Sequence, residues 1–190
     1  MKTIFVILVM FALYSLEIKS QQVVNNNWVF NYGVPDSVNY LVSKEDNQGN
    51  ILVASNIITQ THGNDIFIAK IAVNGDTIWT KQYNYTFNSH DFPTCLEIGS
   101  NNCIYLCGGS ITNNQNLVDF VLLKIDLNGN ILWEKRYNSA SYTVDVPQYM
   151  IIANNGDAYI TGFGVNQSNN YDFVTIKVSN NGSLLWTKKY

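Results

Sequence analysis

The sequence predicts an all-β fold built from three copies of one four-stranded unit. Short runs rich in Ile, Val, Leu, Tyr and Phe alternate with Gly- and Asn-rich turns, which is typical of strands joined by hairpins. Helical periodicity is absent after the N-terminal segment. One pattern also recurs about every 53 residues, because the tryptophans are 51, 54 and 53 positions apart, at Trp28, Trp79, Trp133 and Trp186.

Residues 1–20 have the pattern of a signal peptide. Lys2 is followed by an apolar run from Ile4 to Leu16 and by a short polar stretch that ends at Ser20. This run of 13 residues is shorter than the roughly 20 that cross a bilayer. We therefore expect cleavage near Ser20, a secreted protein and no membrane span in the mature chain, 21–190; the alternative is an uncleaved anchor.

The composition argues against a nucleic-acid partner. Charged residues make up only 13% of the chain, and the net charge is −3. The sequence has no basic patch that would attract nucleic acid or an anionic membrane. Amides and hydroxyls, Asn above all, supply most of the polar surface.

The repeat is clearest in three segments that align without gaps, 65–83, 119–137 and 172–190. Each begins with Asp, continues through an apolar stretch to Lys, turns at Gly, and then carries a Trp and a Tyr at intervals of four residues. The recurring positions are Asp65, Asp119 and Asp172; Lys70, Lys124 and Lys177; Gly75, Gly129 and Gly182; and Trp79, Trp133 and Trp186.

A second alignable block precedes each of these segments and begins at Asp36, Asp91 or Asp145. The first copy of this block has two additional residues, which we place in its turn, near Glu45 and Asp46.

Each copy is predicted to form four antiparallel strands. Asn and Gly at the turns tolerate the positive φ that two-residue hairpin turns require. In the third copy the strands are expected at 145–152, 157–163, 172–179 and 183–190. The three copies span about 36–84, 91–138 and 145–190.

Four short strands repeated at this period match the blades of a β-propeller. A sheet that is apolar on both faces buries them by stacking against its neighbours, so we expect the Trp of the fourth strand to pack between adjacent sheets. Residues 27–32 repeat the Trp-to-Tyr spacing of the fourth strand and predict an additional outer strand. Three blades do not close a ring, since propellers have about 4 to 8. We therefore expect an incomplete propeller, a fragment or truncated product whose open edges can self-associate; the alternative is an open solenoid of stacked sheets.

With these residues in place, the chain resembles the β-propeller repeats of secreted and cell-surface proteins, which carry a D-x-F/Y-V-x-K-x-D-x-x-G-x-x-x-W signature. Ala72 and Ser179 depart from it, where the second copy has Asp126. The resemblance implies the fold and an extracellular setting but no particular activity. A looser resemblance to quinoprotein propellers implies a quinone-dependent dehydrogenase, although this repeat is longer. The second copy fits the signature best, at Asp119, Phe120, Val121, Lys124, Asp126, Gly129 and Trp133.

The recurring aspartates are predicted to be structural. Residues required in every repeat are typical of a shared turn, and we expect Asp65, Asp119 and Asp172 to accept backbone N–H groups in the loop before the third strand. Metal binding is the alternative. The segment DNQGN, 46–50, is similar to part of a calcium loop but lacks the downstream Glu, so we expect a plain turn and no cofactor.

All three cysteines lie in the second copy. Cys103 and Cys107 are four residues apart on one predicted strand, which is too far for a disulfide, and Cys95 meets Cys107 in only one hairpin register. We expect small buried hydrophobic residues, with a free or intermolecular thiol as the alternative. The only histidines, His62 and His90, have no metal-ligand spacing to these cysteines.

The leading functional prediction is a secreted, non-catalytic binding or scaffold module. No catalytic motif is present, and the alternative is a fragment of a propeller enzyme, such as a hydrolase or lyase, whose site lies in missing blades. Loops on a rigid scaffold commonly carry binding, and two sets of loops are expected to emerge on one face and to contact a glycan or an extracellular protein. These loops are 56–64, 109–118 and 163–171, and 84–90 and 138–144. Glycosylation sequons occur at Asn84, Asn166 and Asn181.

Overall fold

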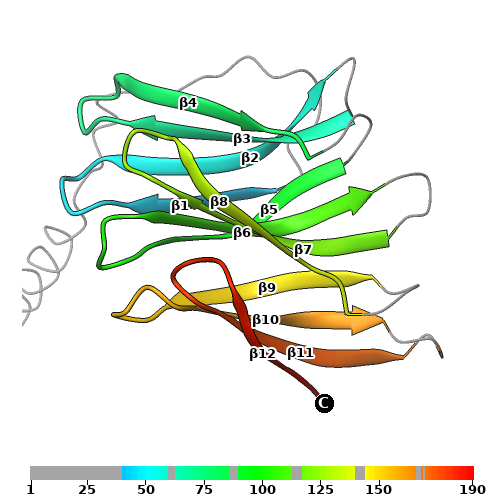
Figure 1. The fold of residues 1–190 in the computed structure, drawn as a ribbon. Coiled ribbons are helices and arrows are strands. Elements are labelled where there is room, and N and C mark those ends of the chain that lie inside the picture. The colour runs from blue at the N-terminus through cyan, green and yellow to red at the C-terminus, as the bar shows by residue number, and fades with distance from the viewer. Residues whose placement is uncertain are drawn as a thin grey trace, which may run out of the picture. The chain divides into compact units, whose positions relative to one another are not determined.

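Three consecutive four-stranded antiparallel sheets make up the described part of the protein (Figure 1). The predicted all-β class is confirmed for these residues. The predicted signal peptide (1–20), the additional strand (27–32) and Asn166 lie outside them. The computed structural model describes residues 40–59, 63–85, 90–112, 117–139, 144–165, 168 and 170–190, all within the unit 31–190.

Each sheet is a meander in which every strand pairs with the next along the chain. Sheet 1 comprises β1 (Leu41–Glu45), β2 (Ile51–Thr59), β3 (Gly63–Ile71) and β4 (Thr77–Tyr83). Sheet 2 comprises β5 (His90–Ile98), β6 (Ile104–Thr112), β7 (Leu117–Ile125) and β8 (Ile131–Tyr137). Sheet 3 comprises β9 (Asp145–Ile152), β10 (Ala158–Val165), β11 (Tyr171–Val178) and β12 (Leu184–Lys189). A single parallel pair, Asn64 with His90, joins sheet 1 to sheet 2.

The hairpin turns differ from the predicted two-residue type. In the turn from β1 to β2, Asp46 N donates to Asn50 O (2.9 Å) and Gly49 N donates to Asp46 O (3.0 Å), which closes a loop of three residues. The last loop residue has positive φ, 81° at Gly49, as a type I turn followed by a bulge requires. The same two bonds recur in the other β1–β2-type and β3–β4-type turns. The prediction failed because Asn-Gly is common to both turn types.

The two additional residues of the first copy are not in this turn. The turn 46–50 has the same length and bonding as 99–103 and 153–157. The additional length therefore lies between Asp36 and Glu45, upstream of the turn, which corrects the sequence alignment.

The sheets pack face to face in series. We call the face of each sheet that contacts the following one its forward face, and the opposite face its backward face. Leu52, Ile66 and Ile68 on the forward face of sheet 1 form one core with Ile104 and Leu123 on the backward face of sheet 2. A second core joins the forward face of sheet 2 to the backward face of sheet 3 through Tyr105, Phe120, Leu122, Ile160 and Ile176. Burial of these apolar faces is the main stabilising contribution.

No helix among the described residues is long and apolar enough to cross a membrane.

Candidate functional site

The recurring tryptophans connect each sheet to the turn of the next. Trp79 Nε1 donates to the backbone carbonyl of Leu127 (2.9 Å). The indole lies directly against Gly129, where an added Cβ would be 3.0 Å from the ring. Gly129 has positive φ and no side chain, so the turn comes close enough for both contacts.

The contact is repeated between sheets 2 and 3. Trp133 Nε1 donates to the carbonyl of Asn180 (3.0 Å), and an added Cβ at Gly182 would lie 3.1 Å from its ring. The third tryptophan, Trp186, is 38% exposed.

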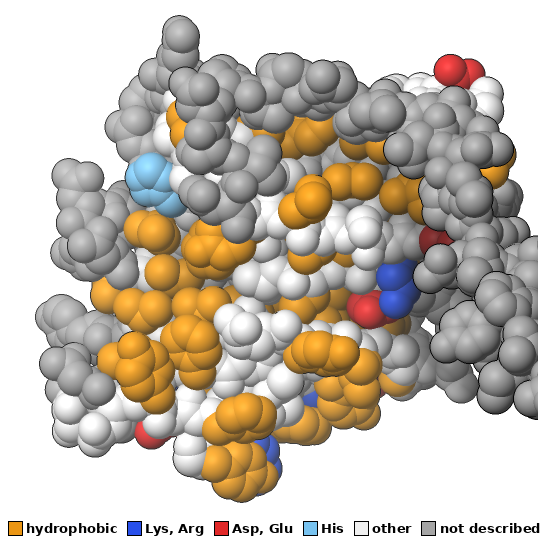
Figure 2. Space-filling view, turned by 180° about the vertical axis from the view of Figure 1, so that it is seen from behind, with side chains coloured by type: hydrophobic (Ala, Val, Ile, Leu, Met, Phe, Trp, Pro, Cys, Tyr) orange, Lys and Arg blue, Asp and Glu red, His pale blue; other side chains and the backbone are white. Residues whose placement is uncertain are grey.

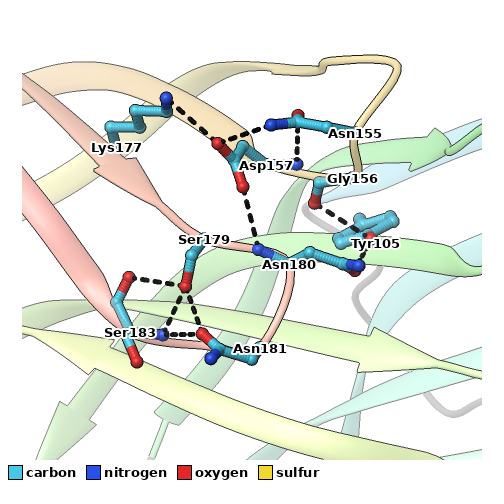
Figure 3. A network of polar contacts seen from close by, with 9 residues as sticks. All are labelled: Tyr105, Asn155, Gly156, Asp157, Lys177, Ser179, Asn180, Asn181 and Ser183. Carbon is cyan, nitrogen blue, oxygen red and sulfur yellow. Dashed lines mark hydrogen bonds and ion pairs between the residues drawn. The ribbon is translucent and has the colours of Figure 1, made fainter.

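Polar side chains reinforce the second of these junctions (Figure 3). The Tyr105 hydroxyl donates to the carbonyl of Gly156 (3.1 Å), and Lys124 Nζ donates to Asn180. Asp157 accepts from Lys177 Nζ (3.0 Å) and from the backbone N–H of Asn180 (3.1 Å). The Lys177 ammonium holds the pKa of Asp157 below its usual value. This network serves to fix two neighbouring turns and leaves no free reactive group.

The segment DNQGN is a turn in which N–H groups donate to both carboxylate oxygens of Asp46. Asp46 Oδ1 accepts from the backbone N–H groups of Gln48 and Asn50, both at 2.9 Å. Asp46 Oδ2 accepts from Asn50 Nδ2 and from the ammonium of Lys70, also at 2.9 Å. Such a carboxylate has no lone pair available for a calcium ion. Burial alone would raise the pKa of Asp46, but the hydrogen bonds from Asn50 and Lys70 lower it well below its usual value.

We expect Asp46→Asn to lose about 1–2 kcal/mol of unfolding free energy at neutral pH. Because the folded pKa of Asp46 is depressed, its contribution is present above the ordinary value near 3.8 and is lost as pH falls below it. The difference from the wild type should therefore shrink in urea titrations at acidic pH. Asp126→Asn is the control, since Asp126 makes the same turn bonds without a lysine and should lose less. A difference that stayed constant with pH would contradict the assignment.

The strand ends that flank the two sets of loops lie at one end of the sheets, which we call the loop end. There β2, β6 and β10 finish, β3, β7 and β11 begin, and β4 and β8 lead into β5 and β9. The pairing of Asn64, near the start of β3, with His90, at the start of β5, joins one strand start from each set.

Buried carboxylates fix the chain between sheets at the loop end. Asp91, fully buried, accepts the backbone N–H of Tyr85 (3.0 Å) and the hydroxyl of Ser110. Asp145, also fully buried, accepts the backbone N–H of Ser139 at 2.7 Å. Burial raises the pKa of Asp145. These two residues head the aligned blocks of the sequence, and their role explains why an Asp recurs there.

Two of the three recurring aspartates at the head of the third strand accept hydrogen bonds from a side chain on the fourth strand. Asp65 accepts from Gln82 Nε2. Asp119 accepts from Arg136 (3.1 Å) and from Asn138 Nδ2 (2.9 Å). Asp172 is half-buried. The predicted backbone donors remain a prediction, because the preceding loops fall partly outside the described residues.

An aromatic and polar cluster, which we call the Tyr85 cluster, lies beside these aspartates at the loop end. It consists of Tyr85, Arg136, Asp119 and Asn138. The Arg136 guanidinium carbon lies 3.7 Å from the centre of the Tyr85 ring, and Tyr85 is 39% exposed. Sequence reasoning identified the loops but missed this cluster, since its members come from two sheets. The available signal was that the first copy has Gln82 where the second copy has Arg136.

A shallow groove of about 250 Å³ runs along the first strands of the three sheets. Ser43, Thr94 and Gln148 supply part of its polar lining. Glu97, the acid in this lining, is paired with Lys44 at 2.7 Å. The lining thus holds no second carboxylate and no nucleophile with a base. Elsewhere in the described ranges, no group of three or more His, Cys, Asp or Glu residues is arranged to hold a metal ion.

Two of the three sequons can be placed. Asn181 is exposed in the turn between β11 and β12, and Asn84 is half-buried after β4.

The three cysteines are free thiols, and the strand register places two of them opposite each other. Cys95 on β5 is directly opposite Cys107 on β6, and both contribute to the core between sheets 2 and 3. Burial raises the pKa of Cys95 and raises that of Cys107 further.

We expect a thiol reagent to label the folded protein first at Cys103, near pH ~8. Cys107 should react only after unfolding, because it is fully buried and its thiolate is disfavoured. Peptide mass mapping of a labelling time course checks this. Labelling of Cys107 as fast as Cys103 in the folded protein would show that the second core is open.

In comparisons with known proteins, neither a family model nor a curated protein matched the sequence.

Proposed function

We propose that the protein is a secreted, non-catalytic binding module in which three propeller blades present the loop end to an extracellular ligand. Serial face-to-face packing, with a tryptophan on the next turn at both junctions, supports the propeller interpretation. The apolar run at the N-terminus supports secretion.

The observation that carries the binding role is the Tyr85 cluster. Its aromatic ring is held by a guanidinium that is itself fixed by Asp119, so the surface is organised before any ligand arrives. Loops rich in Asn, Ser, Thr and Gln surround it in sequence. A flat ring beside rigid hydrogen-bonding groups is well suited to a sugar, which stacks through its C–H face and binds through its hydroxyls. We therefore propose a glycan as the ligand.

The test uses the full mature chain on a glycan array, followed by titration of the best ligand. We expect Tyr85→Ala to weaken binding by about tenfold or more, since loss of a central aromatic contact costs about 1–2 kcal/mol or more. Thermal unfolding should change little. Tyr149→Ala is the matched control, because Tyr149 is 69% exposed and lies on β9, away from the Tyr85 cluster.

Two results would contradict the proposal. Equal binding by the two variants would show that the Tyr85 cluster at the loop end is not part of the binding site. Binding to cells that survives removal of surface glycans would indicate a protein ligand instead.

A further inference from the structure

The forward face of sheet 3 is exposed, although the equivalent face of sheet 2 is buried. Phe173 is 56% exposed, whereas Phe120 at the same repeat position is 1% exposed. Tyr190 is 81% exposed, whereas Tyr137 is 8% exposed. Both pairs occupy matching places in the strand register. The difference therefore comes from the sheet that follows sheet 2.

The strand register places one residue from each strand of sheet 3 in a row across this face, and three of the four are apolar or aromatic. Tyr159 is opposite both Ile151 and Lys177, and Lys177 is opposite Trp186. Seen from behind, hydrophobic side chains are exposed at several places on the surface, including its lower part, over sheet 3 (Figure 2). The exposed apolar residues of the forward face are Tyr149, Ile151, Tyr171, Phe173, Trp186 and Tyr190.

A depression of about 230 Å³ lies on this face and is almost entirely apolar. Tyr149, Tyr159 and Thr161 line it. The equivalent residues of sheet 2 are Cys95, Tyr105 and Cys107, which pack against aliphatic residues on the backward face of sheet 3. The depression is thus the place where a following sheet would insert its own aliphatic residues.

We propose that the forward face of sheet 3 docks the backward face of another four-stranded sheet of the same repeat type. Such a partner supplies small aliphatic side chains for the depression and a Gly-containing turn, whose carbonyl accepts the Trp186 indole. The argument is continuity with the two junctions already present, and it does not depend on the proposed glycan-binding role.

A second copy of this chain fits less well than a separate repeat sheet. Head-to-tail assembly would need the backward face of sheet 1, but Ala69 and Ile71 on that face are each only 1% exposed. Face-to-face assembly would pair two forward faces, whereas the turns that receive Trp79 and Trp133 belong to the backward side of the following sheet.

The test appends a second copy of residues 138–190 after Tyr190 of the full chain. Acrylamide quenching of tryptophan fluorescence is measured for the original and the extended chain, each with and without Trp186→Phe. The difference within each pair gives the quenching of Trp186. In the extended chain, we expect the quenching of Trp186 to fall to the level of Trp133, which packs between sheets 2 and 3. We also expect the unfolding temperature of the extended chain to rise.

The control is Phe173→Glu within the original third sheet. Phe173 is more than half exposed, so the change should leave the 190-residue chain folded and equally stable, but it should abolish the protection of Trp186 in the extended chain. Unchanged quenching in a folded extended chain would overturn the proposal.

Sedimentation and vesicle binding of the 190-residue chain provide a test that does not require the extension to fold. A dimer abolished by Phe173→Glu would assign the face to a second copy and overturn the proposal. Binding to phosphatidylcholine vesicles that the same change abolishes would assign it to lipid, with the same consequence. A chain that is monomeric and does not bind the vesicles supports the proposal.

Discussion

Replacing Trp133 with Ala is expected to lower the free energy of unfolding by about 3 kcal/mol. The change removes an indole that packs on Gly182 and the N–H group that donates to the carbonyl of Asn180 at 3.0 Å. Trp79→Ala should have a similar effect, because Trp79 makes the same two contacts with Gly129 and Leu127. Urea denaturation of the three proteins measures this directly.

Trp186→Ala is the matched control for that comparison. Trp186 has the same repeat position and sheet neighbours, with a ring contact to Tyr159 at 6.1 Å, but no following sheet in the described structure. We expect a loss below about 1 kcal/mol. Equal losses at Trp133 and Trp186 would mean that the tryptophans stabilise their own sheets and not the junctions.

Replacing Gly162 with Ala is expected to cost about 3 kcal/mol or more. An added Cβ would lie 2.1 Å from the carbonyl oxygen of Val146 and 2.8 Å from Cα of Pro147. Both atoms belong to the backbone of β9, which cannot move without breaking its pairing with β10. Gly108→Ala should be equally severe, since its added Cβ would lie 2.1 Å from the carbonyl oxygen of Phe92.

Ser55 is the control for the glycine substitutions. It occupies the equivalent position of β2, opposite Phe67, as Gly108 is opposite Val121. There β1 has no proline-associated bulge, and the position tolerates a side chain. Ser55→Ala should cost below about 1.5 kcal/mol, mostly from the lost bond to the carbonyl of Asn56. A similar loss for Gly162→Ala would show that β9 approaches β10 less closely than described.

The strand pattern and the tryptophan positions could be predicted from the sequence because they are local and periodic. A strand needs only alternating apolar residues, and a glycine turn four residues before Trp79 or Trp133 repeats with each sheet. The turn length could not be obtained in this way, because Asn-Gly serves two-residue and three-residue loops alike. The bulges opposite Gly108 and Gly162 had a usable signal, a proline and a glycine inside predicted strands, which sequence analysis did not use.

The loop end was harder to predict because its contacts join residues far apart in the chain. The pairing of Arg136 with Asp119 spans a hairpin, and the stacking of Arg136 on Tyr85 spans two sheets. The roles of Asp91 and Asp145 follow only from their burial beside a backbone N–H. Recurrence in the sequence therefore identified the positions that matter but not the partners that make them necessary.

Serial packing of the sheets is tested most directly by the proton chemical shifts of two glycines. An indole placed on Gly129 and Gly182 shields the Hα proton that points at its ring. We predict strong upfield shifts at both glycines, lost at Gly129 alone in Trp79→Leu and at Gly182 alone in Trp133→Leu. Ordinary glycine shifts in the folded wild-type protein, or no response to either substitution, would contradict the packing of each sheet on the next.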